Sequence, residues 1–93
     1  MAERILGPFQ DGHVLGRGRE TYLLPAPGSY GITVSIPDLK AVTWILKWSF
    51  RSTPIVSHGT VENEWVAGNV VGCTLIGVTA GTTLRVDAVA IGV

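Results

Sequence analysis

The fold is decided by residues 41–50, AVTWILKWSF, in which a large apolar side chain stands at every second position. An extended chain places alternate residues on one face, whereas a helix would spread the same residues around its whole circumference. The pattern therefore predicts a strand, and its apolar face predicts that this strand forms the centre of the hydrophobic core. We expect the rings of Trp44 and Trp48 to be buried there. The apolar face consists of Val42, Trp44, Leu46, Trp48 and Phe50.

The rest of the chain shares this preference for extended backbone. The β-branched residues Val, Ile and Thr number 12, 7 and 9 among 93 residues, and 12 Gly and 5 Pro interrupt the chain at short intervals. Alternating apolar and polar residues recur over 30–36, 60–67 and 82–93. Turns about every 8–12 residues are typical of sandwiches and small barrels. We predict an all-β protein, a single antiparallel β-sandwich of about 7–8 short strands.

The first twenty residues have a different composition. They contain four glycines and a proline and show little alternation, apart from a possible short strand at Val14-Leu15. We therefore expect residues 1–20 to form an irregular N-terminal arm or loop, and residues 21–93 to form the β-sandwich domain. A chain of this length can bury one modest core.

Charge and apolar content narrow the classes of partner. Seven Lys and Arg residues balance seven Asp and Glu residues, so the net charge is zero, and we expect no nucleic-acid partner and no anionic membrane partner. Residues of the hydrophobic class make up 46% of the chain and charged residues 15%. Part of this apolar surplus is expected to face other proteins. The single cysteine, Cys73, lies in an apolar alternation and is predicted to be a small buried hydrophobe.

Gly16-Arg17-Gly18-Arg19 concentrates two of the five arginines in the expected arm. The segment is either a solvated loop or an arm whose guanidinium groups bind carboxylates of a neighbouring subunit, or local phosphates. Nucleic-acid binding comes third, because only two charges would contribute and the net charge is zero. Phe9 and His13 belong to the same arm and are included as contact residues.

Two further segments are candidates for protein contacts. In the last predicted strand, alternate residues from Leu84 to Ala90 form one face. The other face ends in Val89, Ile91 and Val93, and we expect this apolar end to be exposed. Trp65 is surrounded by acidic and amide residues, so partner contact and a half-exposed core edge are equally compatible with its position. The complete predicted protein interface is Phe9, His13, Arg17, Arg19, Trp65, Val89, Ile91 and Val93.

No pattern in the chain indicates catalysis. His13 and His58 do not stand at a metal-ligand spacing with any carboxylate, and we expect His58 to be a solvated imidazole in a Ser-His-Gly turn. No glycine-rich elbow surrounds a serine. We predict no catalytic residue, no cofactor and no metal, and a protein that is not an enzyme.

Residues 75–89, LIGVTAGTTLRVDAV, resemble the end of a fibronectin type III module, although Leu84 stands where that family usually has tyrosine. This resemblance implies an edge hairpin of a sandwich and no particular function. The chain as a whole, small, neutral and rich in Thr, Val and Gly, resembles the β-sandwich virion proteins of tailed bacteriophages.

The virion resemblance implies a non-enzymatic structural subunit that decorates or stabilises a capsid or forms part of a tail. Its partners would be major capsid or tail subunits and copies of itself, and its location the virion, assembled in the host cytoplasm. The alternative from the residues alone is a carbohydrate-binding or adhesion module that uses exposed tryptophans. A small enzyme or metal protein comes third.

Overall fold

The computed structural model describes residues 3–4 and 13–93, and in them most of the backbone is extended. The strands are β1 (Glu3–Arg4), β2 (Val14–Leu24), β3 (Gly28–Ser35), β4 (Val42–Thr53), β5 (Thr60–Ala67), β6 (Val70–Val78) and β7 (Thr82–Gly92). The all-β prediction is confirmed. The predicted count of about 7–8 short strands is corrected to six strands of 8 to 12 residues and the two-residue β1. Glycines are expected from the sequence to interrupt the chain between strands, but several glycines lie inside strands, and these strands are therefore longer than expected. The described residues form no helix that could span a membrane.

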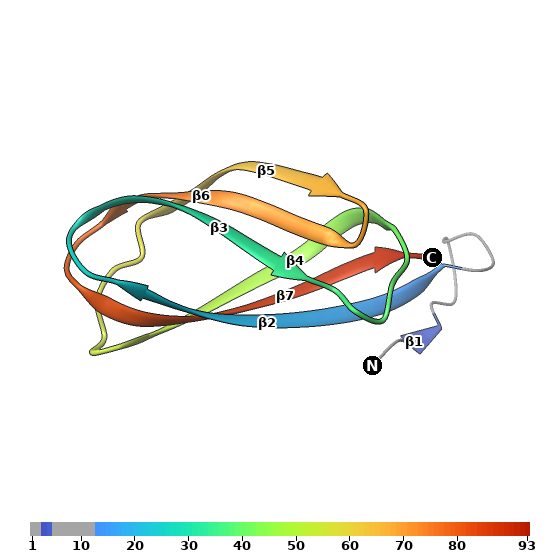
Figure 1. Ribbon diagram of the computed structural model, residues 1–93, viewed down its shortest axis with the longest axis horizontal. Helices are drawn as coiled ribbons and strands as arrows, with labels where there is room; N and C mark the ends of the chain where they lie inside the picture. The colour runs from blue at the N-terminus through green and yellow to red at the C-terminus, as the bar shows by residue number, and fades with distance from the viewer. Residues whose placement is uncertain (1–2, 5–12) are drawn as a thin grey trace.

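The strands form two sheets with the orders β1-β2-β7-β4 and β3-β6-β5, and every neighbouring pair is antiparallel. Figure 1 shows the sheets as two layers, with β3, β6 and β5 in the upper layer and β2, β7 and β4 in the lower one. The chain changes layer from β2 to β3, from β3 to β4, from β4 to β5 and from β6 to β7, whereas β5 and β6 are consecutive strands of one sheet.

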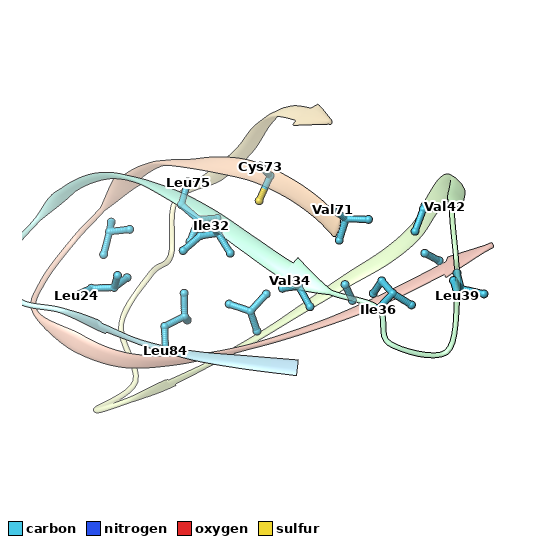
Figure 2. Packing of buried hydrophobic residues seen from close by; sticks show 14 residues of the cluster. Leu24, Ile32, Val34, Ile36, Leu39, Val42, Val71, Cys73, Leu75 and Leu84 are labelled. Atoms are coloured by element: carbon cyan, nitrogen blue, oxygen red, sulfur yellow. The ribbon is translucent and has the colours of Figure 1, made fainter. Parts of the chain in front are cut away.

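The hydrophobic core lies between the two layers (Figure 2). Its lower wall comes from β7, where alternate residues from Leu84 to Ala90 are fully buried. Its upper wall comes from β6 and β3, with Leu75 and Ile32 among the largest buried side chains. Each such side chain contributes about 1.5–3 kcal/mol through burial. The prediction that residues 41–50 form the central strand is wrong, because β7 pairs with both β2 and β4 and leaves β4 at the edge of its sheet.

Two irregularities in β4 explain why only part of its predicted apolar face is buried. Pairing with β7 shifts between Val42 and Trp44 and again between Ile45 and Lys47, so the strand contains two bulges. Val42 lies in the core, but the first bulge turns Trp44 to the outer face, where it is 39% exposed. Leu46 lies in the second bulge and is 47% exposed. Beyond it the alternation resumes, and Trp48 and Phe50 pack against the core as predicted, each half-buried.

Residues 14–20 belong to a long strand, so the predicted arm is wrong from Val14 onward. β2 pairs with β7 from Val14 to Leu24 without a register shift. The glycines of the Gly16-Arg17-Gly18-Arg19 segment face inward, because a Cβ on Gly16 would lie 2.6 Å from Ile36 Cγ2 and one on Gly18 2.1 Å from the carbonyl oxygen of Ser35. The arginines consequently face outward. Residues 5–12 of the expected arm lie outside the described residues.

Side-chain hydrogen bonds join the sheets along both long sides. On one side the Tyr22 hydroxyl of β2 accepts a hydrogen bond from the Thr33 N–H of β3 at 3.0 Å and donates one to the Thr33 carbonyl. These backbone groups lie on the edge of β3, and their hydrogen bonds to Tyr22 prevent them from pairing with another strand. On the other side the Trp48 indole of β4 donates to Glu64 Oε2 of β5 at 2.9 Å.

Candidate interaction surfaces

On the side of the β2-β7-β4 sheet that faces away from the core, the strand register arranges the side chains in rows. Each of its rows contains one residue from β2, one from β7 and one from β4. Because facing residues of neighbouring strands have Cβ atoms about 5 Å apart, side chains of one row are neighbours. The rows are Leu15, Ile91 and Trp44; Arg17, Val89 and Lys47; Arg19, Asp87 and Ser49; Thr21, Arg85 and Arg51; and Leu23, Thr83 and Thr53.

Positive charge is concentrated on this side of the sheet. Five of the seven Lys and Arg residues of the chain stand in these rows, together with Asp87, and Glu3 of β1 pairs with Leu15 of the first row, so the seven groups carry a net charge of +3. The remainder of the neutral chain is correspondingly acidic. We call this surface the basic face; its cations are Arg17, Arg19, Lys47, Arg51 and Arg85.

The carboxylate of Asp87 is shared between two arginines. Arg19 Nε donates to Asp87 Oδ1 at 2.6 Å, and Arg85 Nε lies 3.4 Å from Oδ2 without forming a hydrogen bond to any described residue. Arg51 stands directly opposite Arg85 on β4, and two like charges in facing positions destabilise a sheet. One carboxylate thus stands among several cations.

A shallow, open depression of about 450 Å³ lies in the basic face. Its walls are Arg17 and Val89 on one side and Arg19 and Asp87 on the other, over the backbone of Gly18 and Ala88. The floor is low because Gly18 has no side chain and the methyl group of Ala88 is buried in the core. The depression therefore presents guanidinium groups to whatever enters it.

The apolar row at the end of the basic face corrects one prediction. Ile91 was expected to be exposed, but it is 0% exposed between Leu15 and Trp44. Sequence alternation placed it on the solvent side correctly, and its neighbours on the adjacent strands cover it there. The half-buried ring of His13 lies 6.4 Å from the ring of Trp44.

Val89 and Val93, the other two residues of the predicted apolar end, differ in exposure. Val89 is half-buried between Arg17 and Lys47. Val93 is 52% exposed, and its backbone exchanges hydrogen bonds with Ala41 and accepts one from Lys40. Only Val93 presents a large free apolar surface.

Trp65 lies on the opposite side of the molecule from the basic face. Its pairing with Gly72 of β6 follows a register shift in β5 that contains Asn63 with a φ of 53°. The indole lies over Gly72, where an added Cβ would meet it at 2.1 Å, and the residue remains 43% exposed. Trp44 and Trp65 therefore occupy outer faces of different sheets and do not share a platform.

The two edge strands β4 and β5 border the same long side of the molecule, which we call the β4–β5 side. Exposed large apolar residues collect here: Trp44, Leu46, Trp65 and Val66. Between the strands, the ring of Trp48 stacks on Phe50 at 6.1 Å, and that of Phe50 lies 4.5 Å from His58. His58 is therefore half-buried against an aromatic ring, which corrects the expected solvated imidazole.

Cys73 is buried, as predicted, on the core side of β6. Burial, and to a smaller extent the charge of Glu64, raises the pKa of its thiol from 9.0 to about 11. A neutral thiol in this setting is a poor nucleophile and a poor metal ligand. No three His, Cys, Asp or Glu side chains within residues 13–93 gather as a metal site would require.

The structure brings together four of the predicted contact residues on the basic face: His13, Arg17, Arg19 and Val89. Trp65 lies elsewhere, Ile91 is buried, and Phe9 is outside the described residues. Sequence reasoning missed Lys47, Arg51 and Arg85 as members of the surface. Pairing the segment around residues 14–21 with the last strand would have added Arg85, but its glycines obscured that strand. Lys47 and Arg51 join the surface only through the pairing of β4 with β7.

No protein-family model and no solved structure matches the chain. A UDP-glucosyltransferase of barley, Hordeum vulgare subsp. vulgare, is 35% identical to it over 60 residues. That stretch spans 64% of this chain and 12% of the glucosyltransferase. Similarity to so small a part of a larger enzyme does not transfer the activity of that enzyme.

Proposed function

We propose that the protein is a non-enzymatic β-sandwich module that serves as a structural subunit of a larger assembly. The observation that carries this proposal is the β4–β5 side, where large apolar residues remain exposed along two adjacent strand edges. Exposed apolar side chains gathered in one region are typical of protein-protein contacts. Burying them in a neighbour stabilises the assembly in the same way that core residues stabilise the fold.

The bulges in these edge strands favour side-chain contacts over sheet extension. β4 contains two register shifts and β5 one, and bulges interrupt the regular backbone donors and acceptors that a further strand would need. A partner therefore docks against Leu46 and Val66 as a surface. Such a geometry suits a closed assembly with a defined contact.

The resemblance to tailed-phage virion proteins suggests the kind of assembly. In this proposal the partners are major capsid or tail subunits and copies of the chain itself, and the site of action is the virion. The two-layer arrangement supports the sandwich assignment, since core side chains from both sheets meet between the layers.

Sedimentation velocity over a wide concentration range tests the assembly role. We expect the protein to sediment as an oligomer, and the double variant Leu46→Ser with Val66→Ser to sediment as a monomer. Ile55→Ser is the matched control, because Ile55 is 93% exposed in the β4–β5 connection and its loss should leave the oligomer intact. A wild-type monomer at high concentration that also fails to bind capsid or tail subunits refutes the proposal.

A second candidate function is glycan binding by a single exposed indole. Trp44 and Trp65 each keep a large exposed fraction, and aromatic faces stack on sugars. The separation of the two rings favours one short subsite over an extended platform. Quenching of tryptophan fluorescence by oligosaccharides, abolished in Trp65→Leu or Trp44→Leu alone, would support this candidate, and no change in fluorescence would remove it.

A further inference from the structure

We propose that the basic face binds single-stranded nucleic acid, with phosphates against its arginines and a base stacked on Trp44. This inference goes beyond the assembly role and concerns a different surface from the β4–β5 contact at Leu46 and Val66. The zero net charge argues against nucleic acid only while the charges are taken to be evenly distributed. The fold distributes them unevenly.

Screening makes the local charge decisive. Rows along a strand are about 7 Å apart, so the three charged rows span about 14 Å. The Debye length at physiological salt is about 8 Å, so a chain of phosphates lying on this face interacts with the nearby +3 charge far more strongly than with distant acidic groups. The surface therefore attracts a polyanion although the whole molecule is neutral.

Two cations of this face, Lys47 and Arg51, form no ion pair within the part of the chain that the structure describes. Asp87 already contacts Arg19 and Arg85, and Glu3 of β1 pairs with Leu15 in the apolar row rather than with a residue of the charged rows. Arg51 faces Arg85 across the β4–β7 pair, where an anion placed between them would remove a like-charge repulsion. Guanidinium groups match phosphate oxygens in a two-pronged geometry, so the predominance of arginine suits a phosphate ligand.

An aromatic ring at the end of the charged rows supports nucleic acid over other polyanions. Trp44 lies in the row next to Lys47 and is 39% exposed on the same side of the sheet. Proteins that bind single strands without sequence preference combine a basic surface with rings on which bases stack. An acidic peptide supplies carboxylates but no base for that ring.

A second copy of the chain is a poor occupant of this face, because its acidic residues are dispersed. Glu20 lies on β2, Asp38 in the β3–β4 connection, and Glu62 and Glu64 on β5. On the outer side of the β3-β6-β5 sheet, Glu62, opposite Thr74, is the one carboxylate among the described residues. No concentrated acidic counterpart to the basic face exists within residues 13–93, so the charge complementarity points to an external polyanion.

Fluorescence anisotropy with a labelled oligothymidylate of about 15 nucleotides tests the proposal, since single-strand sites cover about 4–16 nucleotides. We expect binding in about 50 mM salt, and a slope of log K against log salt near −2 to −3, because each of three or four phosphate contacts contributes about −0.7. Arg51→Ala and Lys47→Ala should each weaken binding about fivefold to tenfold and reduce the slope by about 0.7. Lys40→Ala, a cation off this face, is the matched control and should bind as the wild type does.

Trp44→Leu separates nucleic acid from other anions. This variant should bind oligothymidylate more weakly than the wild type with an unchanged salt slope, and the quenching of tryptophan emission on binding should be reduced. Labelled polyglutamate should bind more weakly than the oligonucleotide and be insensitive to Trp44→Leu. Circular dichroism and urea unfolding confirm that each variant is folded.

Three results would overturn the inference. The first is absence of oligonucleotide binding by the wild type in about 50 mM salt, where electrostatic contacts are strong. The second is equal weakening by Lys40→Ala and Arg51→Ala, and the third is equally tight binding of polyglutamate, which would make the partner an acidic protein. The Leu46→Ser, Val66→Ser variant should retain full binding, so failure of this proposal is distinguishable from failure of the assembly role.

Discussion

The indole N–H of Trp48 donates a hydrogen bond of 2.9 Å to a carboxylate oxygen of Glu64, and this bond joins the edge strands of the two sheets. It forms at the β4–β5 side, where the sheets are otherwise held by few backbone contacts. The bulge in β5 between Glu62 and Trp65 allows it, because the extra residue directs Glu64 toward β4.

Breaking this bond should destabilise the fold modestly. We expect Glu64→Ala to lower the free energy of unfolding by about 0.5–1.5 kcal/mol, since the pair is exposed and water replaces part of the interaction. A double-mutant cycle with Trp48→Phe, measured by urea unfolding, isolates the contact. Additive losses in that cycle would show that the bond contributes nothing.

Loss of the Tyr22 hydroxyl should have a similar effect on the opposite side. Tyr22→Phe removes two hydrogen bonds to the Thr33 backbone, so we expect a loss of about 1–2 kcal/mol. Hydrogen exchange at the Thr33 amide should accelerate more than at amides of β6, whose N–H groups keep their strand partners. Unchanged protection of Thr33 would contradict this role for the hydroxyl.

Close packing of β2 against β3 makes Gly18 intolerant of a side chain. In Gly18→Ala the added Cβ would lie 2.1 Å from the Ser35 carbonyl oxygen, so the strands must separate. Overpacking of this kind costs about 1–3 kcal/mol, and we expect the upper end of that range in thermal or urea unfolding. Gly31→Ala is the control: its Cβ meets nothing within 4 Å, and replacing a strand glycine should be neutral or stabilising. Equal stability of the two variants would refute the packing explanation.

The buried thiol of Cys73 should make stability depend on pH in the alkaline range. Its pKa is raised from 9.0 to about 11, so the folded state holds the proton more tightly than the unfolded state. This contribution is complete below pH 9.0 and is lost as the pH rises through about 11. Urea unfolding as a function of pH should show a steeper alkaline decline for the wild type than for Cys73→Ala. Parallel pH profiles for the two proteins would contradict this contribution of the thiol. The same burial predicts that Cys73 reacts slowly with a thiol reagent until the protein unfolds.

Alternation along the chain predicted the later strands well, because it depends only on neighbouring residues. The stretches 30–36, 60–67 and 82–93 correspond closely to β3, β5 and β7. Burial of Cys73 followed from the same pattern. Bulges are invisible to this reasoning, since one extra residue reverses which face each following side chain occupies. Trp44 was therefore placed in the core, and Ile45, which packs against the core, was placed outside it.

The amino-acid sequence by itself determined that the chain is all-β and which residues of β7 face the core, because both follow from local spacing. Tertiary structure decided that β7 rather than β4 is central, and that Arg17 and Lys47, thirty positions apart in the chain, flank the same valine. Strand order and register bring such distant residues together, and no local pattern encodes them. The basic face exists only after β2 and β4 have both paired with β7.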